Sequence, residues 1–335
     1  MNTAVDERLL LACRRHPLTA EVARGLTRAG VPDGARVMVA ASGGADSTAL
    51  MALCAGLSAH GRIALTVGTV DHGIRSESRL DCQSVAAVGA RLGVPVMTRR
   101  LELATGSALA DRARTARYEA LASMAVECDA ASVLAAHHAD DQLETMLIAL
   151  ARGAGLSGLG GMPSRRPIPC EHQGAKGLQL VRPCLRIARE SLRGACVELG
   201  VEWREDPTND RRDTPRGVVR HMVIPALESI AAGVTRRATR TGELARLGNV
   251  LLESHVSAMR HADGSIDRSA LQHAPEALAA TAVWMLADER MDDATRWAAA
   301  EAIVDGSTEP RRFPMTGGSE LSVCAHTIRV RPVTA

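Results

Sequence analysis

Aromatic residues are nearly absent from this chain of 335 residues. The complete set is Tyr118, Trp203, Trp284, Trp297 and Phe313. Because RNA-binding proteins often stack bases on aromatic rings, this scarcity counts slightly against a nucleic-acid partner unless arginine planes substitute for the rings. Lysine is scarcer still, since Lys176 is the single example, so nearly all positive charge is carried by arginine.

Paired cysteines and long apolar runs are also missing. The eight cysteines include no Cys-x-x-Cys pair, which argues against a zinc ribbon, an iron–sulfur cradle and a dithiol redox site. Scattered cysteines in a chain of this length are typical of a reducing cytoplasm, where we place the protein. No run of about 18 apolar residues is present and no signal peptide is recognisable, so we expect no membrane partner.

Charge is unevenly distributed, although the formal net charge is only +2. Residues 151–246 carry 17 basic against 10 acidic side chains, whereas the flanking segments are mildly acidic. A basic middle segment is compatible with a polyanionic partner and equally with a solvated helical surface.

The first half of the chain alternates short apolar runs with longer helical patterns. Strands are expected at 36–41, 63–70, 94–103 and 132–136, and helices at 44–59, 78–92, 109–128 and from 140 onward. This alternation predicts an α/β fold, a parallel twisted sheet with helices on both faces. We expect a surface excursion at 152–180, a first domain over 1–225, a helical linker over 226–266 and a small α+β domain over 267–335.

The most informative motif is Ser-Gly-Gly-Ala-Asp-Ser-Thr at 42–48, directly after the first expected strand and at the start of a helix. Two glycines let the backbone turn tightly, and free N–H groups at a helix start favour an anion such as pyrophosphate. Asp46 would repel phosphate unless a cation lay between them, which suggests Mg²⁺. The motif is not a Walker A loop, because it lacks the Gly-Lys-Ser/Thr step.

Two further clusters follow expected strands. Asp71 and His72 come after the second, and His137-His138-Ala139-Asp140-Asp141 comes after the fourth. Asp140 and Glu144 are four residues apart and share a helical face. Asp141 and Glu144 also have capping-box spacing, which explains the acids without function but does not explain the paired histidines. Because ligands bind beyond the carboxyl ends of parallel strands, acids here could complete a metal site with Asp46.

Taken in order, these motifs resemble those of one enzyme family. The loop at 42–48 is similar to that of the N-type ATP pyrophosphatases, which cleave ATP between its α and β phosphates. Within that superfamily, several segments resemble the tRNA(Ile)-lysidine synthetases over nearly the whole chain. They are Asp71–Arg75, Ala113–Tyr118, His137–Thr145, Arg152-Gly153, Gly158–Met162, Val181–Pro183, Asp206–Asn209, Arg216–Arg220 and the tail from about Leu271.

The resemblance implies a function and a set of site residues. The family joins free L-lysine to the wobble cytidine of tRNA(Ile) with a CAU anticodon, using ATP and Mg²⁺, so segment 1–225 would be the catalytic domain and 267–335 a tRNA-recognition domain. The implied catalytic residues are Asp46, Asp141, His137 and Glu144, of which Asp46 and Asp141 would lie near the metal. The implied ATP-binding residues are Ser42, Gly43, Gly44, Ala45, Asp46, Ser47, Thr48 and His72. The candidate tRNA-binding residues are Arg182, Arg216, Arg220, Arg236, Arg237 and Arg240.

Three alternatives stay open at this point. A tRNA thiolase on the same loop would need sulfur-carrying cysteines, usually in a Cys-x-x-Cys pair. A small-molecule amide ligase is disfavoured by the basic segment, and a non-catalytic ATP-binding module by the intact Asp46, Asp141 and Glu144. Oligomeric state cannot be read from the sequence, and a homodimer remains an option.

Overall fold

The computed structural model describes residues 5–73, 78–102, 109–205, 212–287 and 290–333. Within them the chain forms two compact units, one of residues 1–148 and 162–240, the other of residues 149–161 and 241–335. The dividing point falls inside one long helix, α11 (Val234–Ala258), rather than near residue 225. The domain limits expected at residues 225 and 266 therefore stay predictions.

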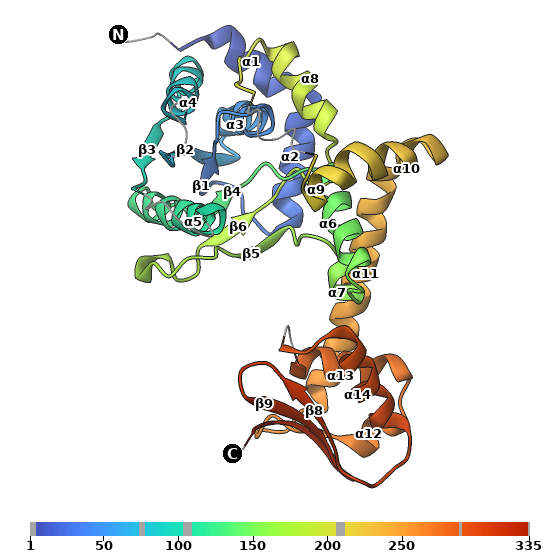
Figure 1. Ribbon diagram of the computed structural model, residues 1–335. Helices are drawn as coiled ribbons and strands as arrows, with labels where there is room; N and C mark the ends of the chain where they lie inside the picture. The colour runs from blue at the N-terminus through green and yellow to red at the C-terminus, as the bar shows by residue number, and fades with distance from the viewer. Residues whose placement is uncertain (1–4, 74–77, 103–108, 206–211, 288–289, 334–335) are drawn as a thin grey trace. The chain divides into compact units, whose positions relative to one another are not determined.

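The first unit is built on a six-stranded sheet of order β3-β2-β1-β4-β6-β5 (Figure 1). Its strands are β1 (Ala35–Ala40), β2 (Ile63–Asp71), β3 (Val96–Arg100), β4 (Ser132–Leu134), β5 (Arg165–Pro167) and β6 (Gln179–Val181). Every neighbouring pair is parallel except β5 and β6. The expected parallel sheet with helices on both faces is confirmed. The surface excursion expected at 152–180 contains β5 and leads into β6, two three-residue strands that were not expected because they are too short to give a periodic pattern.

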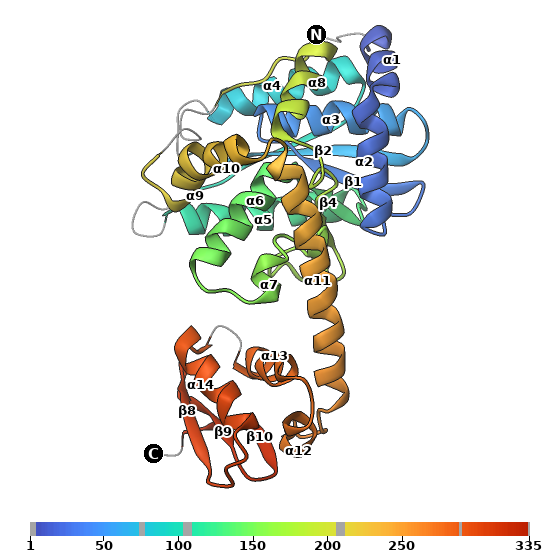
Figure 2. The same cartoon turned by 90° about the vertical axis from the view of Figure 1, so that its right-hand side faces the viewer.

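Side-chain alternation along β1 separates two cores. Val37 and Val39 face one side, with α1 (Glu7–Arg15), α2 (Pro17–Arg28), α3 (Ala45–Ser58), α4 (Ser78–Leu92) and α8 (Arg189–Leu199). Met38 and Ala40 face the other side, against α5 (Leu109–Glu127). Successive residues of a strand point to opposite faces of the sheet, and both faces of β1 are buried. The run Val-Met-Val-Ala is therefore apolar throughout. The turned view separates α3 and α8 from α5 across the sheet (Figure 2).

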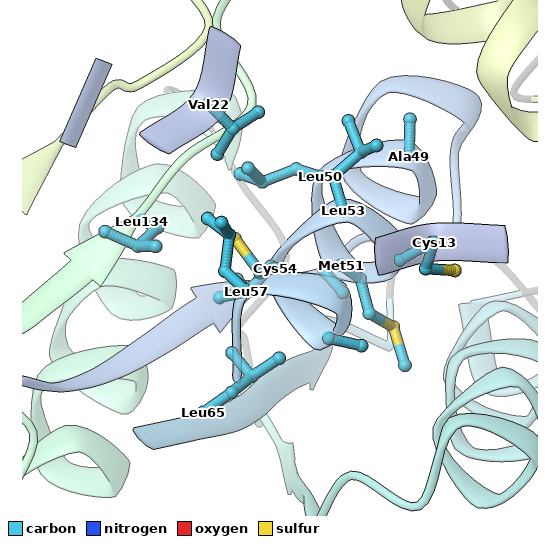
Figure 3. Close-up of a cluster of buried hydrophobic side chains, with 14 of the residues drawn as sticks. Cys13, Val22, Ala49, Leu50, Met51, Leu53, Cys54, Leu57, Leu65 and Leu134 are labelled. Carbon is cyan, nitrogen blue, oxygen red and sulfur yellow. The ribbon is translucent and has the colours of Figure 1, made fainter. Parts of the chain in front are cut away.

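Helix α3 is the centre of the larger core. It is apolar on nearly all sides, and every residue from Ala49 to Leu57 is buried. Leu50, Leu53 and Leu57 lie among Val22 of α2, Leu65 of β2 and Leu134 of β4 (Figure 3). A helix that is hydrophobic all round must be enclosed, so the start of α3 is fixed firmly against the end of β1.

The remaining elements of the first unit follow the sheet. Helix α6 (Ala139–Ala151) starts just after β4 and is shared with the second unit at its end, and α9 (Pro215–Val218), the π-helical turn η3 (Val219–Val223) and α10 (Ile224–Ile230) precede α11. A short 3₁₀ turn, η1 (Gln173–Ala175), lies between β5 and β6. In the described residues, no single helix is long and apolar enough to cross a membrane. The helical segments Pro215–Ile230 and Val234–Ala258, which meet at a bend, reach the required length and apolar composition only when they are counted together.

The second unit has its own core and its own sheet. The sheet is antiparallel with order β7-β10-β9-β8, formed by β7 (Ile266–Asp267), β8 (Arg311–Met315), β9 (Ser319–Val323) and β10 (Thr327–Pro332). It packs with α12 (Arg268–Gln272), α13 (Glu276–Ala287) and α14 (Asp293–Val304), and α7 (Leu156–Leu159) also belongs to this unit. The small α+β module expected near the end of the chain is confirmed.

Candidate active site

The order of the strands in the sheet indicates by itself where a ligand site lies. The chain runs outward through β1, β2 and β3 and then returns to put β4 on the other side of β1. In open parallel sheets, ligands bind beyond the carboxyl ends of the strands at the point where the strand order reverses. Here that point lies between β1 and β4. The glycine-rich loop follows β1, and the paired histidines follow β4.

The loop at 42–48 is held in shape by Ser47. Its hydroxyl accepts the backbone N–H of Ser42 at 3.1 Å and donates to the carbonyl of Gly44 at 3.0 Å. Gly44 precedes the first residue of α3 and makes no side-chain cap, so no capping side chain occupies the N–H groups at the helix start. These groups and the helix dipole suit the phosphates of a nucleotide.

Gly43 is required by the backbone of this loop. Its φ is +84°, and a Cβ there would lie 3.1 Å from the carbonyl oxygen of Asp81. The carbonyl of Gly43 also accepts the N–H of Arg204 at 2.9 Å, and Arg204 Nε donates to Asp81 Oδ1 at 2.7 Å. The loop is therefore clamped between α4 and the segment that follows α8.

His138 joins the loop to the acids of α6. Its Nε2 lies 3.6 Å from Asp46 Oδ2 and 3.4 Å from Asp141 Oδ2, and its Nδ1 lies 3.6 Å from Asp140 Oδ2. Burial opposes a charge on this imidazole, but the surrounding carboxylates outweigh burial and raise its pKa to about 9. His138 is therefore a cation that partly neutralises three carboxylates at neutral pH.

His137 differs from its neighbour in its environment. Burial lowers its pKa to about 4, so the ring is neutral at physiological pH. Its Nδ1 is buried and has no hydrogen-bond partner among the described residues. A neutral imidazole with an unused nitrogen is suited to accepting a proton or a hydrogen bond from a ligand.

Two arginines and two acids form a compact ion-pair cluster. Arg216 donates from Nε to Glu144 Oε2 at 2.5 Å and from Nη2 to Asp141 Oδ1 at 2.6 Å. Arg220 donates to both oxygens of Glu144, at 2.6 and 3.1 Å. The side chain of Glu144 is 1% exposed, so its charge is stabilised almost entirely by these guanidinium groups.

The chain around Thr214 explains why the arginines reach the acids. Thr214 caps α9 by accepting the N–H of Gly217 at 3.0 Å, and Pro215 occupies the first helical turn, where its missing N–H costs nothing. Arg220 then falls in the π-helical turn η3, a geometry often found at functional sites. Cap and turn together aim both side chains toward α6.

Comparisons with known proteins agree with this geometry. The sequence pattern of a family described as "PP-loop domain" matches residues 18–227. A "tRNA(Ile)-lysidine synthase" of Salinispora arenicola is 38% identical over 260 residues, which cover 75% of this chain and 76% of that protein. The chain belongs to the tRNA(Ile)-lysidine synthase family. A Ruegeria pomeroyi protein of the same name is 45% identical over 176 residues, covering 52% of this chain and 40% of that relative's length.

A solved structure supports the fold. The U34-tRNA thiolase NcsA from Methanococcus maripaludis, with its [4Fe-4S] cluster, aligns with a TM-score of 0.56 at 16% identity, covering 72% of this chain and 80% of that one. At that identity the likeness concerns the architecture alone.

As a member of this family with a PP-loop domain, the chain binds ATP. One cavity lies at the loop and a second is lined by residues of α6 and α8. A small one of about 30 Å³ is lined by Ser42, His72 and Arg117, among others. His72 Nδ1 is buried without a partner in the described part of the chain, so His72 can still bond to a ligand there. A larger cavity of about 320 Å³ is lined by Asp140, Glu144, Arg189, Glu190, Arg193, Arg220 and Ile224.

The fit to Mg²⁺ rests on Asp46. Its Oδ1 is buried and has no hydrogen-bond partner among the described residues, as expected of an oxygen reserved for a cation. Asp141 is less available, because Arg216 and His138 engage its two oxygens. Over the described ranges, no group of three His, Cys, Asp or Glu side chains is arranged to hold a metal by itself. Mg²⁺ usually takes one or two carboxylates from a protein and completes its shell with phosphates and water.

The structure separates the arginines expected to contact tRNA. Arg182 is buried and donates to the carbonyl of Pro163 at 2.8 Å, and burial lowers its pKa to about 10. Arg236 and Arg240 are exposed on α11, and Arg237 bonds to carbonyls at 231 and 232. The expected tRNA contacts stay predictions, and burial favours a structural role for Arg182.

Sequence reasoning missed the pairing of Arg216 and Arg220 with Asp141 and Glu144. The signal was the matched spacing of two arginines four apart and two acids three apart, each on one helical face. Residues Arg75 and Asp206–Asn209, which carry part of the resemblance, lie outside the described residues.

Proposed function

We propose that this chain joins free L-lysine to the wobble cytidine of an isoleucine tRNA with a CAU anticodon, converting ATP to AMP and pyrophosphate. The observation that carries the proposal is the meeting of two clusters at the reversal of strand order. Asp46 Oδ2 at the start of α3 lies 3.6 Å from His138 Nε2, and the same nitrogen lies 3.4 Å from Asp141 of the acid–arginine cluster. The loop at the start of α3 suits a triphosphate, and the acids of α6 suit an amine.

The first half-reaction follows from the loop. The cytosine 2-carbonyl oxygen attacks the α-phosphate of ATP, the bond to the β-phosphate breaks, and pyrophosphate leaves. The N–H groups at the start of α3 hold the departing pyrophosphate, and Ser47 keeps the loop in the required shape. Asp46 would hold Mg²⁺, which supplies charge neutralisation for the phosphates.

The second half-reaction needs a lysine ε-amine without its proton. That amine attacks C2 of the adenylated cytosine, and AMP departs with the former carbonyl oxygen. The cavity of about 320 Å³ contains both signs of charge, with Asp140, Glu144 and Glu190 beside Arg189 and Arg193. Carboxylates would bind the amino groups of free lysine, and guanidinium groups its carboxylate. The neutral ring of His137 is our candidate for handling the proton.

The tRNA would lie against the basic part of the chain. Arg236 and Arg240 are exposed, and residues 151–246 hold the surplus of positive charge. Such charges bind a phosphate backbone without reading its sequence. We further propose that the protein acts in the cytoplasm, in keeping with eight free cysteines.

Sulfur transfer on the same fold is the competing activity, and the cysteines argue against it. Cys184 and Cys196 are the thiols whose pKa is raised by burial and also by the negative charge of Asp46, and both are buried. Burial raises the pKa of each to about 12, so neither is a thiolate at neutral pH.

The direct test is transfer of labelled lysine to an unmodified isoleucine tRNA(CAU) transcript with ATP and Mg²⁺. A methionine tRNA serves as the substrate control and Asp46→Ala as the site control. We expect transfer to the isoleucine tRNA only, and loss of transfer in the variant. Release of pyrophosphate on another substrate without lysine transfer would overturn the assignment and leave the ATP site standing.

A further inference from the structure

One cavity of the second unit takes no part in either half-reaction. It measures about 700 Å³ and is formed entirely within residues 149–161 and 241–335. Its walls come from the segment of α7, from the C-terminal half of α11 and from the helix pair α13 and α14. That volume is within the range of ligand sites and can hold a nucleotide with its sugar and phosphate.

Two of the five aromatic residues of the chain line this cavity. Trp284 of α13 and Trp297 of α14 meet edge to face, with ring centroids 5.3 Å apart and planes at 70°. Trp297 is 48% exposed, although a tryptophan is normally largely buried. A chain with so few aromatic rings therefore places an indole at the surface of a cavity, the arrangement on which unpaired bases stack.

The charges around the tryptophans restrict the ligand. The guanidinium carbon of Arg296 lies 5.5 Å from the centre of the Trp284 ring, in a cation–π contact. A second cation on that ring would be repelled by Arg296, so an ammonium ligand is disfavoured. A neutral planar base that carries a phosphate fits both the indoles and the arginine.

The polar wall of the cavity offers hydrogen-bond acceptors. Asn249 Nδ2 donates to Glu253 Oε1 at 2.7 Å, which directs the amide oxygen of Asn249 away from the carboxylate. Asn249 Oδ1 and Glu253 Oε2 accept no other hydrogen bond within the described ranges. Guanine presents two adjacent donors, N1–H and the 2-amino group, on its pairing edge. Adenine presents an acceptor at N1, which a carboxylate repels.

We propose that this cavity binds one unpaired guanine base of the RNA substrate, stacked on Trp297 and read by Glu253 and Asn249. The proposal rests on the proposed function for the identity of that RNA as a tRNA. It makes the second unit a reader of a single exposed base in addition to any contact with the phosphate backbone.

The test compares three variants in tRNA binding, measured by filter retention at one salt concentration. Trp297→Ala should weaken binding about five- to hundredfold, the range for loss of one base–aromatic stack. Glu253→Gln should weaken it about tenfold, because the new amide group would turn a donor toward guanine N1–H once its oxygen accepts from Asn249. Glu309→Gln, an exposed carboxylate of the same unit outside the cavity, should bind as the wild type does.

Folding and ligand identity are controlled separately. Trp297→Phe should restore most of the affinity that Trp297→Ala removes, since a phenyl ring still stacks. A tRNA transcript with sparse 6-thioguanosine, irradiated in the complex, should crosslink to a peptide that contains Trp284 or Trp297, and Glu253→Gln should lose that crosslink. Equal binding by Glu253→Gln and the wild type, or crosslinks confined to other peptides, would overturn the proposal.

The outcome also separates this site from the catalytic assignment. If the wild type transfers lysine while both cavity variants bind tRNA normally, the guanine site is wrong and the enzyme assignment stands. If the wild type binds tRNA but transfers no lysine, the assignment fails, and the affinities alone decide the guanine site. If the wild type binds no tRNA, both are overturned.

Discussion

Arg216 Nε donates to Glu144 Oε2 at 2.5 Å across 72 residues of sequence, and Arg220 holds the other oxygen of the same carboxylate. Glu144 is fully buried, so its charge depends on these two partners. Removing one member of such a cluster leaves unbalanced charge in a low-dielectric setting, and that costs more than the intact cluster contributes.

We therefore expect Glu144→Gln to lower the free energy of unfolding by about 3 kcal/mol, the lower end of the range for buried pairs because Arg216 is half exposed. Urea denaturation followed by circular dichroism measures this loss. Glu127→Gln, which breaks the exposed pair with Arg99, should cost less than about 1 kcal/mol. Equal losses in the two variants would show that burial does not decide the effect.

The alternation of strands and helices was readable from the sequence at β1, β2 and β4, because each of these strands is part of a short apolar run beside a helical pattern, whereas β5 and β6 follow no such pattern. The loop at 42–48 was readable for a different reason, since Gly43 is required where φ is positive. The partners of Glu144 were not readable, because no local rule predicts which arginine of a distant segment meets a given acid. The cavity lined by Trp284 and Trp297 could not be predicted either, because the two residues lie on different helices and the sequence does not show that these helices pack together.

Gly43 and Gly34 form a matched pair for testing the loop. Both have positive φ, +84° and +75°, but a Cβ at Gly34 would meet nothing within 4 Å. Alanine at either position should cost about 1 kcal/mol of stability through backbone strain. Only Gly43→Ala should also weaken ATP binding, about tenfold or more, because its methyl group pushes against the Asp81 backbone. Equilibrium dialysis with labelled ATP distinguishes the two, and an equal loss of affinity in Gly34→Ala would contradict this account.

Asp46 should govern the Mg²⁺ dependence of ATP binding. Its free, buried Oδ1 is the oxygen that a cation would use, and asparagine keeps the shape while it removes the charge. We expect Asp46→Asn to shift the Mg²⁺ midpoint of ATP binding at least tenfold higher. Asp33→Asn, on an exposed turn, should leave that midpoint unchanged. An unchanged midpoint in Asp46→Asn would place the ion on other ligands.

The arginines of α11 should act through charge alone. Arg236 and Arg240 are exposed, so replacing both by glutamine should reduce the slope of log affinity for tRNA against log salt by about 0.7 to 0.9 for each phosphate that is no longer neutralised. Arg15→Gln, at another exposed arginine on α1, should leave the slope as it is. If affinity fell at every salt concentration with no change of slope, these side chains would not be neutralising phosphates.

Arg268 tests how the second unit is held together. It is 1% exposed, and its guanidinium donates to the carbonyls of Ile303 at 3.0 Å and Ala302 at 2.7 Å, and to Asp305 at 3.1 Å. Arg268→Met fills the space but leaves these acceptors without donors, so we expect a loss of about 3 kcal/mol or more. In a Trp203→Phe background the remaining tryptophans, Trp284 and Trp297, report on this unit alone, and their thermal transition should fall by several degrees. The side chain of Arg312 is 66% exposed beside Glu320, so Arg312→Met should shift that transition little. A comparable fall in the two variants would mean that the hydrogen bonds from Arg268 to buried carbonyls do not stabilise the unit.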